Sequence, residues 1–174
     1  MSARRSLCAA LLMSAALLCA CEPKDRRPGL WLSGDVVTEP VSDWSFTDAV
    51  PEIFVETRTW YGVPHSVTTV CAADGERLYV PSLYREGGEF PEKRFWNRNV
   101  VRDPRVRLSI DGRIYERRAV LVEDPAEWQT ALAAFARKSP FWKDLADQLA
   151  ANPEADAPRI YFLRMDPRAD GESD

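Results

Sequence analysis

Apolar and polar positions alternate through the middle of the chain, between residues 52 and 122. Short segments rich in β-branched and aromatic side chains recur there, and Gly-containing turns such as Asp74-Gly75 and Asp111-Gly112 separate them. Alternation over so few residues predicts strands. We expect these strands at 52–57, 65–71, 77–80, 105–110 and 113–122. Short strands joined by tight turns are typical of a closed or nearly closed antiparallel barrel.

The apolar spacing becomes helical in the last third of the chain. Trp128, Leu132 and Phe135 recur at the helical period after Asp124-Pro125, and Ser139-Pro140 begins a second helical segment. Residues 159–165 alternate again and complete the sheet as a sixth strand. A short basic helix is expected at 93–101, after the third strand, and an irregular arm or short helix at 42–49. The pattern therefore predicts a mainly β (α+β) fold, a six-stranded antiparallel barrel with a short helix after the third strand and a C-terminal helical pair.

The first twenty residues have the pattern of an export signal. Arg4-Arg5 precedes an apolar run over 7–18, and the chain turns abruptly polar at Glu22. The run is too short to span a bilayer, which takes about 20 residues; a short buried helix is the alternative. Leu18-Cys19-Ala20-Cys21 resembles a bacterial lipobox, which implies cleavage before Cys21 and lipidation of its thiol. Arg4-Arg5-Ser6-Leu7 also resembles a twin-arginine signal, so the export route stays open.

These segments define a domain organisation. We expect a lipoprotein signal peptide at 1–20, a lipid-anchored tether at 21–30, one folded domain at 31–168 and an acidic tail at 169–174. The expected location is the bacterial cell envelope, outside the cytoplasm, with the lipid on Cys21 holding the protein to a membrane. Loss of the signal, which contains two basic and no acidic residues, changes the net charge from −4 to −6.

Composition narrows the function classes. The 174 residues include 23 Lys and Arg against 27 Asp and Glu, which argues against a general nucleic-acid binder because such a protein needs a basic face. His65 is the only histidine, so metal sites built on two or more histidines are excluded, and we expect no metal site. The sequence contains no Gly-x-Ser-x-Gly motif and no phosphate-cradling glycine-rich loop. After cleavage before Cys21 and lipidation of its thiol, Cys71 is the only free thiol, expected to be buried and inert, with a redox role as the alternative.

An ordered set of motifs within residues 52–167 resembles one known family. It comprises Gly62-Val63-Pro64-His65-Ser66, Leu78-Tyr79-Val80-Pro81-Ser82, Lys93-Arg94-Phe95-Trp96-Asn97-Arg98-Asn99, Asp103-Pro104-Arg105-Val106-Arg107-Leu108 and Tyr161-Phe162-Leu163-Arg164-Met165-Asp166-Pro167. This order resembles the FMN-binding split barrel of pyridoxamine-5'-phosphate-oxidase-like proteins and of the related deazaflavin-dependent reductases. The resemblance covers about 110 residues and implies that the predicted barrel is a split barrel.

The resemblance also implies a cofactor and its site. It implies FMN, with a deazaflavin less favoured, bound between the second strand, the end of the third strand and the following helix. The implied cofactor-binding residues are His65, Ser66, Val67, Thr68, Pro81, Ser82, Lys93, Arg94, Trp96 and Asn97. Cationic side chains, hydroxyls and N–H groups at a helix N-terminus suit the flavin phosphate, and Trp96 suits stacking on the flavin ring. No side chain is assigned a catalytic role, because the flavin supplies the hydride chemistry. Paired barrels in the family imply a homodimer.

Each of these residues also has a structural interpretation. His65 fits a half-exposed strand position, Lys93 and Arg94 fit a solvated helix face, and Trp96 fits the core. Arg102, Arg105 and Arg107 are expected to face solvent or to pair with Glu116 across the strands. Two functions therefore stay open. One is an FMN-dependent oxidoreductase; the other is a non-catalytic split-barrel lipoprotein that binds a flavin, deazaflavin, haem or another small ligand.

Overall fold

A computed structural model of the protein describes residues 29–85, 87–151 and 159–168. The predictions of a signal peptide at 1–20, of lipidation at Cys21, of most of the tether and of the tail at 169–174 therefore lie outside the described residues. No helix within the described ranges is long and apolar enough to cross a membrane.

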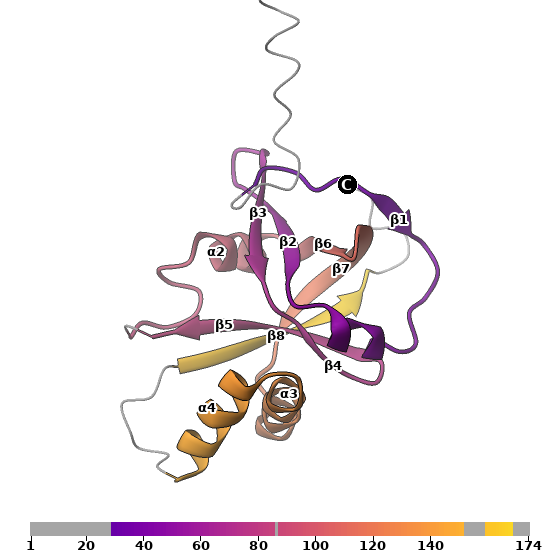
Figure 1. The fold of residues 1–174 in the computed structure, drawn as a ribbon. Coiled ribbons are helices and arrows are strands. Elements are labelled where there is room, and N and C mark those ends of the chain that lie inside the picture. The colour runs from indigo at the N-terminus through magenta and orange to yellow at the C-terminus, as the bar shows by residue number, and fades with distance from the viewer. Residues whose placement is uncertain (1–28, 86, 152–158, 169–174) are drawn as a thin grey trace, which may run out of the picture.

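One sheet forms the body of the molecule (Figure 1). Its strands are β1 (Asp35–Val37), β2 (Ile53–Arg58), β3 (Pro64–Thr69), β4 (Ala72–Asp74), β5 (Arg77–Tyr84), β6 (Arg105–Ile110), β7 (Arg113–Leu121) and β8 (Arg159–Pro167). Hydrogen-bonded neighbours follow the order β3-β2-β6-β7-β8-β5-β4, and every pair along this path is antiparallel. The mainly β, antiparallel fold predicted from the sequence is confirmed.

The two strands at the ends of this path, β3 and β4, belong to one continuous segment of the chain, which brings the two edges of the sheet together. β3 and β4 follow each other directly, with only Val70 and Cys71 between them, yet β3 pairs with β2 while β4 pairs with β5. β3 and β5 are therefore not hydrogen-bonded to each other, and the barrel is split between them. The sequence resemblance places the cofactor beside this split, between the second strand, the end of the third strand and the helix that follows it.

The predicted count of six strands is too low, because the sheet has eight strands within the described residues. The segment expected at 65–71 and its continuation form two strands, and β1 was not predicted. β1 is three residues long and mostly exposed, and it pairs in parallel with the start of β7, Val36 opposite Ile114. A strand this short and exposed carries no alternation for a pattern to detect.

Helices cover the sheet on different sides. α2 (Phe95–Arg102) lies beside β2 and β3, whereas α3 (Pro125–Lys138) and α4 (Pro140–Ala151) form a pair beside β8, as Figure 1 shows. The Asp124 carboxylate caps α3 by accepting from the backbone N–H groups of Ala126 and Glu127. The predicted C-terminal pair is confirmed, and the irregular arm at 42–49 contains a short 3₁₀ helix, η1 (Ser45–Ala49).

Two apolar clusters result. The barrel interior contains residues such as Ile53, Leu108 and Leu163, and the N-terminal arm adds Trp44 to it. The second cluster packs α3 and α4 on β5 and β8; Phe135 and Phe162 stack there with ring centroids 5.4 Å apart. Both clusters are fully buried at their centres, so the barrel is a rigid support for its opening.

Candidate functional site

Helix α2 lies at the split of the barrel and is tied by side-chain hydrogen bonds to β5 and to β2. The Asn97 Nδ2 donates to Ser82 Oγ at 2.6 Å and to Tyr84 Oη at 2.8 Å, both on β5. The Asn99 Nδ2 donates to Thr57 Oγ1 on β2 at 3.0 Å. Both asparagines are buried. Because buried polar groups need partners, these bonds fix the position of α2 over the opening.

Four polar atoms in this region are buried and have no hydrogen-bond partner within the described residues. They are His65 Nδ1, Ser66 Oγ, Thr68 Oγ1 and Asn97 Oδ1. All four belong to residues that the resemblance assigns to the cofactor. An unpartnered buried polar group costs about 1–3 kcal/mol, so such groups usually indicate a bound water, ion or ligand. A ligand with both donors and acceptors would satisfy this set.

The strand register divides these atoms between two faces of β3. His65 lies opposite Thr57, whereas Ser66 lies opposite Glu56 and Thr68 opposite Phe54. Cross-strand partners share a face, so His65 is on the side of α2 and the two hydroxyls are on the other side. The His65 ring contacts Phe95 of α2 edge-on, with centroids 5.3 Å apart. The structure thus brings His65 together with the start of α2 and leaves Ser66 and Thr68 on the outer face.

Burial determines the protonation state of His65. Desolvation lowers the pKa of His65 below its ordinary value of about 6.5. The imidazole is therefore neutral at pH 7, when one ring nitrogen is a donor and the other an acceptor. Nδ1 can form either kind of hydrogen bond with a ligand.

The predicted basic pair Lys93-Arg94 precedes α2 instead of forming its first turn. Arg94 is the N-cap residue, and Lys93 has a left-handed backbone with φ of 58°. Both side chains donate to backbone carbonyl groups that precede them: Lys93 Nζ to Gly87 O in the loop at 3.2 Å, and Arg94 to Leu83 O at the end of β5. The expectation that the pair lies on a helix is corrected, because the positive φ at Lys93 delays the first helical turn.

A cavity of about 350 Å³ opens beside this pair. It is lined by Tyr84, Arg85, Gly87, Lys93 and Arg94. Among the residues that the structure describes, the lining has three cationic side chains and no acidic one. No side-chain hydrogen bond caps the N-terminus of α2 in the described part of the chain, so its first N–H groups can also face an anion. This chemistry suits a phosphate group.

The other predicted site residues contribute mainly to packing. Trp96 is buried in the barrel interior with Val100, which agrees with its interpretation as a core residue. Val67 packs against the same interior. Pro81 is buried in β5, opposite Phe162 of β8, and the neighbouring Ser82 reaches α2 through Asn97.

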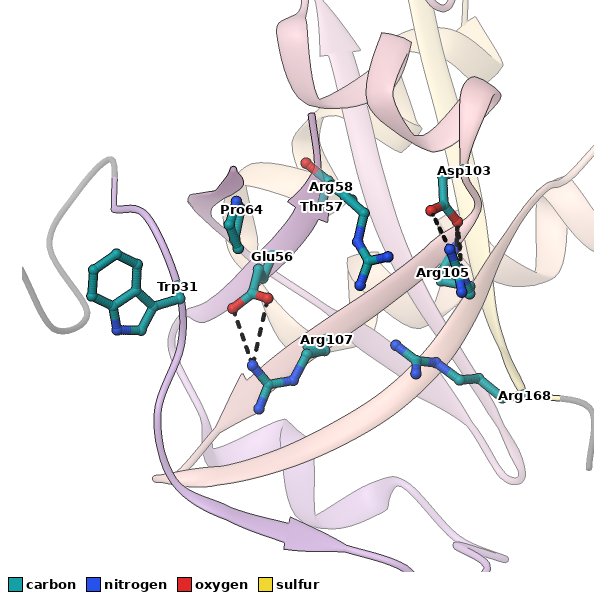
Figure 2. A pocket seen from close by; sticks show the side chains of 9 residues that line it. All are labelled: Trp31, Glu56, Thr57, Arg58, Pro64, Asp103, Arg105, Arg107 and Arg168. Atoms are coloured by element: carbon teal, nitrogen blue, oxygen red, sulfur yellow. Dashed lines mark hydrogen bonds and ion pairs between the residues drawn. The ribbon is translucent and has the colours of Figure 1, made fainter. Parts of the chain in front are cut away.

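A second polar pocket lies on the outer face of the sheet (Figure 2). It has a volume of about 240 Å³ and is lined by Trp31, Glu56, Thr57, Arg58, Pro64, Asp103, Arg105, Arg107 and Arg168. Sequence reasoning assigned no site here. The expected pairing of Arg107 with Glu116 is present, with Arg107 Nε 3.6 Å from Glu116 Oε1. Arg58 and Arg168 also line the pocket. These two residues are far apart in sequence, and only the strand order brings them to one pocket.

Cys71 is not among the lining residues of these two pockets. It is a free, buried cysteine, and burial raises the pKa of its thiol. The neighbouring Lys138 ammonium donates to the carbonyl oxygens of Thr47 and Cys71, at 2.5 and 2.9 Å. Within the described residues, no cluster of three or more His, Cys, Asp or Glu side chains is arranged to hold a metal ion.

No protein-family model matches this chain, and no curated protein matches its sequence. Solved structures do match. A conserved hypothetical protein from Mycobacterium tuberculosis is 16% identical, with a TM-score of 0.52, covering 78% of this chain and 86% of that one. A proposed 5-nitroimidazole antibiotic resistance protein from Bacteroides thetaiotaomicron is 14% identical, with a TM-score of 0.50, covering 81% and 90%.

A weaker match is a pyridoxamine 5'-phosphate oxidase-related, FMN-binding protein from Nostoc punctiforme. It is 14% identical, with a TM-score of 0.43, and covers 70% of this chain and 74% of that one. The first two matches, with TM-scores of 0.52 and 0.50, concern the fold alone. Together with the strand order, they support the antiparallel split-barrel fold that the sequence resemblance implied.

Proposed function

We propose that the protein binds a flavin, FMN in the first place, at the opening beside α2, and that it is an FMN-dependent oxidoreductase. The observation that carries this proposal is the pair of buried, unpartnered atoms His65 Nδ1 and Asn97 Oδ1 within the described residues. Both belong to residues that the sequence resemblance assigns to the cofactor. A flavin ring system offers hydrogen-bond donors and acceptors that would satisfy them.

The cationic cavity supports a phosphate-bearing cofactor. Lys93 and Arg94 line it together with Arg85, and the N-terminus of α2 adjoins it. Arg94 is already oriented, because its guanidinium lies over the Tyr84 ring at 5.5 Å and donates to a backbone carbonyl group. Oriented cationic donors bind phosphate through charge-assisted hydrogen bonds.

When bound, the flavin supplies the hydride chemistry. The chain's own residues bind the flavin, orient it and exclude water from it. Neutral His65 would hydrogen-bond the cofactor, and Asn97 would connect the cofactor to β5 through Ser82 and Tyr84. Ser66 and Thr68 remain predicted contacts on the opposite face of β3.

The test is direct measurement of flavin binding. The full chain should bind added FMN with micromolar or better affinity, measured by quenching of flavin fluorescence. Lys93→Ala and Arg94→Ala should each weaken binding by about 1.5–3 kcal/mol, the contribution of a charge-assisted hydrogen bond. Lys143→Ala is the matched control, because it removes the same charge from an exposed ion pair on α4 and should leave affinity unchanged. No binding, or unchanged affinity in both pocket variants, would refute this site.

Turnover separates the two functions left open by the sequence. Reduction of bound FMN by a nicotinamide or another hydride donor, followed by reoxidation, would support the oxidoreductase. Stable flavin binding without reduction by any donor would instead support the non-catalytic binding lipoprotein.

We propose a lipid anchor on Cys21 and a location in the cell envelope. The support is the lipobox-like Leu18-Cys19-Ala20-Cys21 after a charged and apolar segment. The intact mass of protein purified from membranes should equal that of residues 21–174 plus acyl chains. Cys21→Ala should abolish the added mass, and an unprocessed N-terminus in the wild-type protein would refute the anchor.

We also propose a homodimer. Apolar side chains are exposed at the β2–β3 turn, where Trp60, Tyr61 and Val63 are 76%, 54% and 40% accessible. Exposed apolar groups of this kind are typical of interaction surfaces. Light scattering should give twice the chain mass, and Trp60→Asp with Tyr61→Asp should give a monomer. A monomeric wild-type protein would refute the proposal.

A further inference from the structure

We propose that a cavity between the N-terminal arm and the α3–α4 pair binds a small monocarboxylic acid with a flat apolar body. We call it the arm cavity, and its volume is about 360 Å³. Its lining consists of Asp48, Ala49, Pro51, Val70, Cys71, Phe135, Lys138, Ser139 and Trp142. None of these residues belongs to the candidate flavin site, so the proposal does not depend on flavin binding.

The arm cavity lies where three parts of the fold meet. They are η1 with the residues that follow it, the link between β3 and β4, and the junction of α3 with α4. Lys138 connects all three, because it ends α3 and its Nζ donates to Thr47 O at 2.5 Å and to Cys71 O at 2.9 Å. Figure 1 shows α3 and α4 below β5 and β8, whereas α2 lies above them. The arm cavity and the opening beside α2 are therefore separate sites.

Apolar side chains form most of the lining of the arm cavity. Phe135 and Trp142 are 1% and 6% exposed, with ring centroids 4.7 Å apart. Phe135 also stacks on Phe162, so the core fixes its ring. Mostly apolar pockets of roughly 300–1,000 Å³ with a few polar groups are typical of small-molecule sites. At about 360 Å³ the arm cavity is at the lower end of this range, which indicates a compact ligand.

The Lys138 ammonium group determines the chemistry of the ligand. It has three N–H donors, and the carbonyl oxygens of Thr47 and Cys71 take two of them. Within the described residues the third donor has only Cys71 Sγ, a weak acceptor 4.0 Å away, and no carboxylate forms an ion pair with Lys138. Lys138 is partly buried, and buried charges are usually paired. A ligand carboxylate would supply both the acceptor and the opposite charge.

Asp48 limits the charge of the ligand to a single carboxylate. It is exposed and lines the arm cavity from η1, so a second negative group on the ligand would meet a like charge. One cation and one anion thus line the arm cavity, whereas the cavity beside Lys93 and Arg94 has three cations. A monocarboxylate matches the first lining, and a phosphate matches the second.

Calorimetric titration of the full chain with cinnamate tests the site. Cinnamamide is the neutral counterpart of the same shape, and it should bind about tenfold more weakly or less well still, because it lacks the charge that pairs with Lys138. Lys138→Met should remove this preference by weakening cinnamate binding to the level of cinnamamide. Lys143→Met is the matched control: Lys143 is exposed on α4 and pairs with Asp147, and its loss should change affinity less than about twofold.

A second variant keeps the test decisive where loss of Lys138 disturbs folding. Ala49→Trp fills the arm cavity from an exposed position on η1, so it should keep the circular dichroism of the wild type and lose cinnamate binding. Lys93→Ala with Arg94→Ala should bind cinnamate as the wild type does, even where FMN binding is lost. Absence of cinnamate binding at millimolar concentration would overturn the proposal. So would equal affinity of the wild type for the acid and the amide, or equal cinnamate affinity in wild type and Ala49→Trp.

Discussion

Replacement of Asn97 by alanine should destabilise the protein by about 2–4 kcal/mol, because two buried hydroxyl groups lose their donor. Ser82 Oγ and Tyr84 Oη accept from Asn97 Nδ2 at 2.6 and 2.8 Å, and all three residues are buried. Each hydroxyl left without this partner costs about 1–3 kcal/mol, and removal of the unpartnered Asn97 Oδ1 returns part of that cost. With a urea slope of about 2 kcal/mol/M, the unfolding midpoint should fall by roughly 1–2 M.

Urea unfolding followed by circular dichroism measures this change. Arg98→Ala is the control on the same helix: Arg98 is exposed, and its guanidinium lies 5.7 Å from the Phe95 ring centroid, a contact of about 0.5–1 kcal/mol. A double-mutant cycle with Ser82→Ala should give a coupling of about 1 kcal/mol between the two side chains. If Asn97→Ala costs no more than Arg98→Ala, then α2 is not held to β5 in the way described here.

Three further predictions concern other parts of the molecule. Burial lowers the pKa of His65, so the unfolded chain binds the proton more readily than the folded chain. The stability of the wild type should therefore fall relative to that of His65→Gln as the pH drops below about 6.5, and parallel pH profiles of stability for the two proteins would contradict this. Burial raises the pKa of Cys71, so peptide mass spectrometry should find alkylation of Cys71 roughly a hundredfold slower in native than in urea-unfolded protein, and equal rates would show that the thiol is accessible. Phe162→Ala should cost about 3–5 kcal/mol because Phe162 is fully buried between β8 and the helices, whereas Phe141→Ala, at a position that is 47% exposed, should cost far less; similar midpoints in thermal unfolding would refute the packing described for α3 and α4.

The barrel strands were predictable because burial on one face imposes alternation. The strand expected at 105–110 is β6, Arg105–Ile110, with Val106 and Leu108 inside and Arg105 and Arg107 outside. The strand expected at 77–80 ends before Pro81, and proline cannot donate to a ladder. The observed strand continues to Tyr84, since β4 pairs only with residues 77–79 of β5 and Pro81 lies beyond that ladder.

The candidate site was predictable in composition but only in part in its geometry. The basic pair Lys93-Arg94 and the polar segment from His65 were evident from residue types and order. The faces they occupy depend on the register of β3 against β2, which opposes His65 to Thr57 and Ser66 to Glu56. A shift of one residue would exchange the two faces, and no local pattern fixes it.

The polar pocket of Figure 2 was not predictable from local sequence. Arg58 and Arg168 are separated by most of the folded domain, and each alone has the appearance of a surface charge. They line one pocket because β2, β6, β7 and β8 are consecutive neighbours in the sheet. Strand order is a property of the whole chain, so a site formed across four strands becomes visible only when the sheet is assembled.

The central claim is that the opening beside α2 holds a flavin. Protein purified from its native membrane should show the visible absorption of bound flavin, or should acquire it when FMN is added and unbound FMN is removed by gel filtration. Lys93→Ala with Arg94→Ala, purified in the same way, should lose that absorption while keeping the circular dichroism of the wild type. A colourless wild-type protein that does not retain FMN would contradict the account.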